Sequence, residues 1–306
     1  MNSVICTLFE GNYHYGLGAL ANSLYFHGYR GTMWAGYRGN LPPWAHPLER
    51  VSENVDKYQL SKDCSICFIK LSINHHFTNF KPTFMLYLWE KYCPDAEAMF
   101  YFDPDIVTKC RWSFFEEWVE FGVALCEDVS SPILQNHPFR MQWKNMCKPH
   151  GFTLDKVTDV YVNGGFVGVK KDLSDFLVIW SKLLDLIAPE IGGLQNPKIY
   201  DITSMLRTPD QEALNMALMD FNGLSSIIAK EGMDFIYGGF TMSHAIGGPK
   251  PWKKAMALMA LKGKPPRLQD KEYWKYTQYP IKLYSSQRYF FKKMDLLVGS
   301  IIGRIL

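Results

Sequence analysis

Short apolar runs bounded by polar loops recur along the first 170 residues. They have strand length and are rich in β-branched and aromatic residues, which is typical of buried strands; they cover residues 4–8, 65–71, 98–102, 123–126 and 160–169. Segments of helical character stand among and after them, at residues 19–24, 82–92, 112–121, 172–188 and 209–218. The alternation of the two kinds of segment predicts an α/β fold with parallel crossovers.

Composition indicates a globular chain. With 306 residues, 47% hydrophobic and 21% charged, the sequence can bury a substantial core in one large or two closely joined domains. Seven scattered cysteines, an odd number in a chain of this size, favour reduced thiols over a disulfide framework. No apolar run has the length of a membrane span and no leader segment is visible, so we expect a cytoplasmic protein.

The most informative segment is the apolar run 98–102, which ends in Asp103-Pro104-Asp105. The carboxyl end of a buried strand in an α/β sheet opens into the ligand crevice. Two carboxylates there favour Mg²⁺ or Mn²⁺, which commonly bridges a protein carboxylate to a substrate phosphate. Two alternatives remain open at this point: a solvated turn, and the nucleophile and acid of a haloacid-dehalogenase-like phosphatase.

A second motif lies near the C-terminal end, at His244-x-x-Gly247-x-x-Lys250. It combines a metal-capable imidazole, a glycine and a compact positive charge within seven residues. Imidazole suits Mn²⁺ better than Mg²⁺, and a lysine can neutralise a diphosphate. Asp103, Asp105 and His244 together therefore favour manganese, with magnesium as the alternative.

With these motifs the chain resembles a GT-A-fold glycosyltransferase of the glycogenin and bacterial lipooligosaccharide galactosyltransferase family, over residues 4–252. Asp103-Pro104-Asp105 resembles the family's Asp-x-Asp motif, and residues 244–251 match its His-x-x-Gly-x-x-Lys-Pro pattern. Asn163-Gly164-Gly165 and Asp210-Gln211 lie where the family has its donor-sugar strand and its Asp-Gln pair. The likeness implies a Rossmann-like fold with a mixed, mainly parallel central sheet flanked by helices.

The resemblance also implies roles for single residues. Asp103, Asp105 and His244 would hold Mn²⁺ or Mg²⁺ on the diphosphate of a nucleotide-sugar donor. Asp210 and Gln211 would be the catalytic pair, Asp210 holding sugar hydroxyls and Gln211 stabilising an oxocarbenium-like centre by its dipole. The residues expected to bind the donor are Thr7, Asn12, Tyr13, Lys81, Asp103, Asn163, Gly164, Gly165, Gly247 and Lys250.

The implied activity is that of a hexosyltransferase. It would move a sugar from a UDP-sugar to a glycan or glycolipid with retention of anomeric configuration, as in lipopolysaccharide or capsule assembly. The expected catalytic domain covers residues 1–252, with a nucleotide-binding half at 1–105 and a donor and acceptor half at 106–252. The phosphatase is less favoured because no second acidic motif follows Asp105, and a non-catalytic sugar-nucleotide-binding protein stays open as an alternative.

Residues 253–306 form a basic, aromatic C-terminal helical tail. From Gly248 onward the chain has 13 basic and three acidic residues, a net charge of +10, against −7 for the remainder. Cations beside aromatic and aliphatic residues suit a helix that lies on an anionic lipid surface. We therefore expect peripheral contact with the cytoplasmic face of the inner membrane, or else a terminal helix packed on the core or a partner subunit. No nucleic-acid-binding module is present.

Overall fold

The computed structural model describes residues 1–305, which form two compact units. The first unit contains Met1–Leu8, Leu71–Phe102 and Ser113–Lys230. The second unit contains Phe9–Lys70, Asp103–Trp112 and the chain from Glu231 onward. The sequence-based division at residue 252 stays a prediction, and Leu306, at the end of the expected tail, lies outside the described residues.

The first unit is built on strands in the order β10-β8-β9-β6-β1. Their bounds are β1 (Ser3–Glu10, in this unit as far as Leu8), β6 (Ala98–Phe102), β8 (Val123–Cys126), β9 (Phe166–Lys170) and β10 (Ser225–Ile228). Strand β6 pairs in parallel with β1, while β9 runs antiparallel to β6 and β8. All five residues of β6 are buried, as its apolar sequence predicts.

Helices of the first unit carry the side chains considered below. They are α2 (Lys81–Lys91), α3 (Trp112–Val119, in this unit from Ser113), α4 (Pro138–Cys147), α5 (Asp175–Ile187) and α6 (Pro209–Asp220), with short 3₁₀ turns η2 (Phe77–Phe80), η3 (Lys148–His150) and η4 (Lys171–Leu173). Helix α6 begins with proline, and all its residues except Asp220 are buried. Its apolar and polar positions alike therefore face protein, which explains its weak amphipathic pattern.

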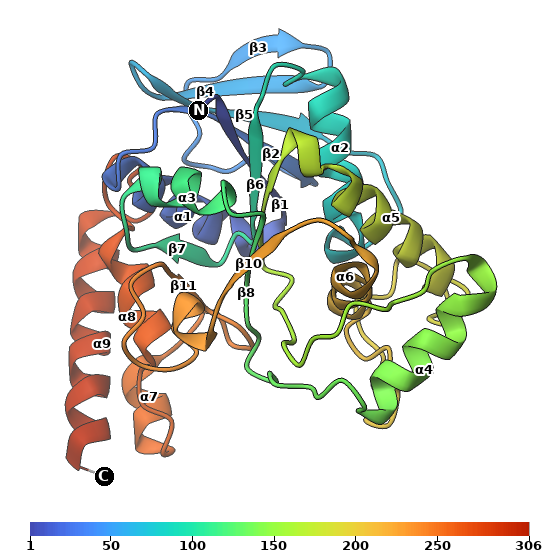
Figure 1. Cartoon of the computed structure of the whole chain (residues 1–306). Coiled ribbons are helices and arrows are strands. Elements are labelled where there is room, and N and C mark those ends of the chain that lie inside the picture. The colour runs from blue at the N-terminus through green and yellow to red at the C-terminus, as the bar shows by residue number, and fades with distance from the viewer. Residues whose placement is uncertain (306) are drawn as a thin grey trace. The chain divides into compact units, whose positions relative to one another are not determined.

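The second unit has strands in the order β2-β5-β4-β3 and a separate two-stranded ladder of β7 and β11. The bounds are β2 (Gly31–Arg38), β3 (Glu49–Ser52), β4 (Val55–Ser61), β5 (Cys64–Lys70), β7 (Ile106–Thr108) and β11 (Met242–His244). Its helices are α1 (His14–Phe26), α7 (Met256–Leu261), α8 (Leu268–Lys275) and α9 (Ser286–Ile305), with 3₁₀ turns η1 (Gly11–Tyr13) and, at its border, η5 (Lys230–Met233). Helix α9, red in Figure 1, runs beside α7.

The predicted α/β class, with a mixed central sheet, flanking helices and a C-terminal helix, is confirmed. Two details differ from the sequence pattern. The apolar run at residues 160–169 forms a strand only from Phe166, with one isolated bridge at Val162, because the glycine pair interrupts it. The polar stretch after Asp128 contains the helix α4, whose amphipathic pattern was not recognised. No helix within residues 1–305 has the length and apolar character needed to cross a membrane.

Helix α1 packs closely against the turn that follows β6. A Cβ atom on Gly16 would overlap the backbone oxygen of Pro104, whereas one on Gly18 would meet only the end of the Leu283 side chain. Backbone cannot move away as a flexible side chain can. Gly16 is therefore required for the position of the Asp103-Pro104-Asp105 turn.

We predict that Gly16→Ala lowers the free energy of unfolding by about 1–3 kcal/mol, the usual cost of overpacking. Alanine favours helices over glycine by about 1 kcal/mol, so a net loss requires the clash. Gly18→Ala in the same helix is the matched control and should cost less in urea unfolding, because the Leu283 side chain that it meets can shift whereas backbone cannot. Equal effects of the two substitutions would contradict the close approach to Pro104.

Candidate functional site

Asp103, Asp105 and His244 form a cluster in the second unit, here called the metal cluster. Asp103 and Asp105 lie in the turn before β7, and β11 pairs with β7 so that His244 stands opposite Ile106. One ligand atom from each of the three residues lies within 4.8 Å of the other two. The imidazole Nε2 is 3.3 Å from Asp105 Oδ1 and 3.8 Å from Asp103 Oδ2. Antiparallel pairing thus joins two motifs far apart in the sequence.

Lys250 completes the charge arrangement of the metal cluster. Its ammonium group forms an ion pair with Asp105 and donates a hydrogen bond of 2.8 Å to the carbonyl oxygen of Ala245. Burial by itself would raise the pKa of Asp105, but His244 and Lys250 outweigh it and hold that pKa well below its usual range. Asp105 is thus ionised in the folded protein.

The residues of the metal cluster fit a divalent cation. A ligating imidazole is neutral, so the two carboxylates and Lys250 leave one negative charge uncompensated. The Nδ1 atom of His244 is buried without a hydrogen-bond partner in the part of the chain that the structure describes. Two carboxylates and one imidazole are a donor set suited to Mn²⁺, and Mg²⁺ accepts the carboxylates as well.

The loop after β11 is shaped by glycine. Gly247 has a φ of +72°, in the left-handed region that favours glycine, and a Cβ on it would meet nothing within 4 Å. On the other side of Lys250, the Tyr13 ring lies 5.7 Å from the ammonium nitrogen and 5.5 Å from the Trp252 ring centroid. Burial raises the pKa of Tyr13. Asn12, also expected at this site, is exposed in η1.

The remaining predicted residues belong to the first unit, where most of them lie around Asp210. Lys81 is 2% exposed; its ammonium group contacts Asp210 Oδ2 at 2.9 Å and the Gly164 carbonyl oxygen at 2.8 Å. The other oxygen of Asp210, Oδ1, is buried with no hydrogen-bond partner among residues 1–305. We call Lys81, Gly164, Asp210 and Gln211 the Asp210 cluster. Asp210 makes an ion pair here instead of capping α6 with its side chain.

Backbone and side-chain hydrogen bonds orient the Asp210 cluster. The Gly164 N–H donates to Gln211 Oε1 at 3.1 Å, so the amide nitrogen of Gln211 is left as its donor group. Asn163 donates to Asp128 Oδ2 at 2.7 Å and accepts from the Gly165 N–H at 2.9 Å. Its side chain therefore holds the glycine pair in place. A Cβ on Gly164 would lie 3.1 Å from Asp210 Oδ2, so glycine permits the close approach.

Thr7 is placed apart from these contacts. It lies on β1, fully buried, and its hydroxyl oxygen has no hydrogen-bond partner within the described chain. A buried hydroxyl without a partner is unusual in a native structure. Its predicted role in donor binding stays a prediction.

Two supporting residues were missed by the sequence analysis. Glu212 accepts hydrogen bonds from the Tyr161 hydroxyl at 3.1 Å and the Thr208 N–H at 2.7 Å. Asn215 binds both backbone groups of Val162, at 2.8 and 2.9 Å, and so fastens the glycine-pair segment to α6. Glu212 and Asn215 are three residues apart in the helical segment that begins at Pro209, and this was the one available signal.

Comparisons with known proteins support the fold. Neither a scan of family models nor a search of curated proteins yields a match. Among solved structures, the chain is similar to the apo structure of WbbM, a bifunctional glycosyltransferase, with a TM-score of 0.52 and 13% identity. The match covers 95% of this chain and 52% of that one, so the chain spans about half of its length. At this identity the likeness shows a glycosyltransferase-type α/β fold, consistent with the predicted GT-A class.

We predict that Glu212 makes stability depend on pH. Burial raises its pKa from 4.5 to about 8, so folding takes up a proton between those two values. The free energy of unfolding should therefore fall as pH rises across this window, by up to about 1.4 kcal/mol per pH unit. The Glu212→Gln variant should lose this part of the slope in urea unfolding, while Glu190→Gln, at an exposed position, should keep it. An unchanged slope in E212Q would show that Glu212 is ionised when folded.

Proposed function

We propose that the chain is a metal-dependent glycosyltransferase that uses a UDP-sugar. The observation that carries the proposal is the metal cluster with its paired Lys250, in a fold shared with a solved glycosyltransferase. Asp103, Asp105 and His244 would hold Mn²⁺ or Mg²⁺, and when bound this ion supplies Lewis-acid stabilisation of the leaving diphosphate. Lys250 and the open backbone at Gly247 would contact the same diphosphate, with Asn12 and Tyr13 contributing to nucleotide binding.

The Asp210 cluster is proposed to bind the transferred sugar. Asp210 Oδ1 lacks a hydrogen-bond partner in the described chain and can accept from a sugar hydroxyl, while Oδ2 is paired with the Lys81 ammonium group. Gln211 already engages its carbonyl oxygen with Gly164, so it would act on the sugar through its amide N–H groups. If the Gln211 side-chain carbonyl were to stabilise the anomeric centre by its dipole, its hydrogen bond with the Gly164 N–H would first have to break. Retention of configuration remains part of the proposal.

A phosphatase is less well supported than a transferase. In that interpretation Asp103 would be the nucleophile and Asp105 the general acid, but His244 and Lys250 hold the pKa of Asp105 well below its usual range, so Asp105 has no proton to donate. The fold similarity to a glycosyltransferase points the same way. A non-catalytic nucleotide-sugar-binding protein would use the same metal cluster, and only turnover separates it from the enzyme.

We predict that UDP binds only with Mn²⁺ or Mg²⁺ present, and that Asp105→Asn weakens this binding at least about tenfold, since a charged ligand is lost. Isothermal calorimetry with and without Mn²⁺ measures the effect. Glu53→Gln, which removes an exposed carboxylate of the same unit, should bind as the wild type does. A screen of UDP-sugars for release of UDP then tests turnover. Metal-independent UDP binding, or no nucleotide binding at all, would overturn the proposal.

We also propose that α9 docks on an anionic membrane, which suits a lipid-linked glycan acceptor such as one of lipopolysaccharide or capsule assembly on the cytoplasmic face of the inner membrane. The helix packs on α7 through Leu296 and Gly299, and Asp295 accepts hydrogen bonds from the first N–H groups of α7. The rest of its apolar surface is exposed, at Phe290, Phe291, Met294, Leu297, Val298, Ile301 and Ile305. The two alternatives expected from the sequence, a helix packed on the core and a helix that docks on a membrane, are thus compatible with each other, because they use different faces of α9.

Replacing both Phe290 and Phe291 by serine should reduce binding to vesicles of phosphatidylcholine with 30 mol% phosphatidylglycerol by roughly tenfold or more, because two aromatic side chains lose their burial in lipid. Both side chains are about 60% exposed, so folding should persist. Sedimentation with vesicles measures the change, and Phe121→Ser, at 68% exposure in the first unit, is the control. Unchanged sedimentation of the double variant would contradict docking through α9.

A further inference from the structure

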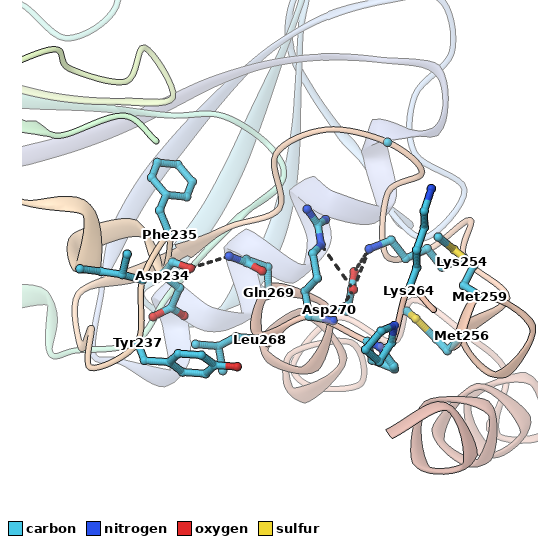
Figure 2. Close-up of a pocket in the computed structure, with 15 residues that line it drawn as sticks. Asp234, Phe235, Tyr237, Lys254, Met256, Met259, Lys264, Leu268, Gln269 and Asp270 are labelled. Carbon is cyan, nitrogen blue, oxygen red and sulfur yellow. Dashed lines mark hydrogen bonds and ion pairs between the residues drawn. The ribbon is translucent and has the colours of Figure 1, made fainter. Parts of the chain in front are cut away.

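A cavity of about 580 Å³ lies within the second unit, lined by α7, α8, the segment after η5 and Gly248. Its volume is in the range of small-molecule sites. Figure 2 shows aromatic residues at one end, Phe235 and Tyr237, and lysines and methionines at the other, with Gln269 and Asp270 between them. None of the predicted site residues lines it.

The aromatic end adjoins the metal cluster. The Phe235 ring centroid lies 6.0 Å from that of His244, with the two planes tilted by 36°. Tyr237 is 90% exposed at the edge of the cavity. Aromatic rings combine a large apolar face with, in tyrosine, a polar tip, and this combination suits the C–H face and the hydroxyls of a sugar ring.

The opposite end has an excess of positive charge. Lys254, Lys264 and Arg267 line the cavity, and the carboxylate available to them is Asp270, which Lys254 contacts at 2.6 Å and Arg267 at 3.7 Å. The other lining carboxylate, Asp234, is already paired with Lys109 at 2.6 Å. Cations therefore exceed available carboxylates by two, and the Lys264 ammonium group makes no ion pair or hydrogen bond with another described residue.

Arg267 links the cavity to the loop at residues 245–250, which the proposed function assigns to the diphosphate and which we call the phosphate-binding loop. Its Nη1 donates a hydrogen bond of 3.0 Å to the Ile246 carbonyl oxygen, in the loop between His244 and Gly247. Its Nη2 is buried and has no hydrogen-bond partner within residues 1–305. The Arg267 side chain as a whole is 39% exposed and lines the cavity, so its positive charge would attract an anionic group bound there.

We propose that this cavity binds the acceptor and selects a sugar that carries an anionic group. The sugar ring would lie on Tyr237, and its phosphate or carboxylate would be attracted toward Lys264 and Arg267. This inference rests on the proposed transferase function, to which it adds the substrate class. The phosphate-binding loop, bordered by Gly248, would place such an acceptor beside the donor diphosphate.

Binding of glucose 6-phosphate, glucose and inorganic phosphate to the full chain, without nucleotide, tests the proposal by calorimetry. We expect glucose 6-phosphate to bind about tenfold or more tightly than glucose or phosphate alone, because the charge-assisted hydrogen bonds add to the ring contacts. Lys264→Ala should remove about tenfold of this affinity, and Lys262→Ala, an exposed neighbour that does not line the cavity, should leave it unchanged. Tyr237→Ala should weaken glucose and glucose 6-phosphate alike, with Tyr200→Ala, equally exposed, as its control.

The inference is overturned if glucose 6-phosphate does not bind at millimolar concentration, if phosphate alone binds as tightly, or if K264A and K262A behave alike. UDP binding with Mn²⁺, measured on the same preparation, separates the two proposals. Retained UDP binding without sugar-phosphate binding rejects only the cavity. Sugar-phosphate binding that depends on Lys264, without UDP binding, rejects the transferase and leaves an anionic-sugar site.

Discussion

Neutralisation of buried carboxylates governs the arrangement of this protein. An uncompensated charge inside a protein costs several kcal/mol, so each buried aspartate needs a cation at a fixed place. Asp105 forms an ion pair with Lys250, 145 residues further along the chain, and Asp210 forms one with Lys81, 129 residues before it. Lys250 lies in the loop that follows β11 and Lys81 is the first residue of α2, and both candidate sites consist of the groups around these ion pairs.

Asp105 and Asp210 differ in how many of their carboxylate oxygens already have a protein partner. The carboxylate of Asp105 faces both Lys250 and His244, so a divalent ion would share a ligand that the protein has already ionised. Asp210 engages one oxygen with Lys81 and leaves the other without a protein partner in the described residues. Glu212, two residues later, has a pKa raised to about 8 by burial, and so it is mainly neutral at pH 7. Closely spaced acids thus differ in their partners, and for Glu212 burial shifts the pKa toward the neutral form.

Much of the fold could be predicted from local pattern. The strand at residues 98–102 and the helices beginning near Asp175 and Pro209 follow from buried apolar runs, periodicity and a proline in the first helical turn. Helix α4 was missed because its mean polarity resembles that of a loop, although its histidine cap and proline mark a helix start. The segment before Phe166 was expected to be a strand, but both backbone groups of Val162 form hydrogen bonds with the side chain of Asn215. Periodicity could not show a side chain as the partner of backbone groups.

The sequence alone determined which residues are candidates for a site: a strand that ends in Asp103 and Asp105, and a loop with His244, Gly247 and Lys250. Residue type and spacing suffice for this because carboxylates, imidazole and glycine have intrinsic ligand and backbone preferences. Tertiary structure decided which of these side chains meet, which oxygen of Asp210 has no protein partner among the described residues, and which atom of Gln211 accepts a hydrogen bond from Gly164. It also formed the cavity beside Arg267 from helices with no recognisable motif. Such contacts depend on distances between segments remote in sequence, which local pattern cannot encode.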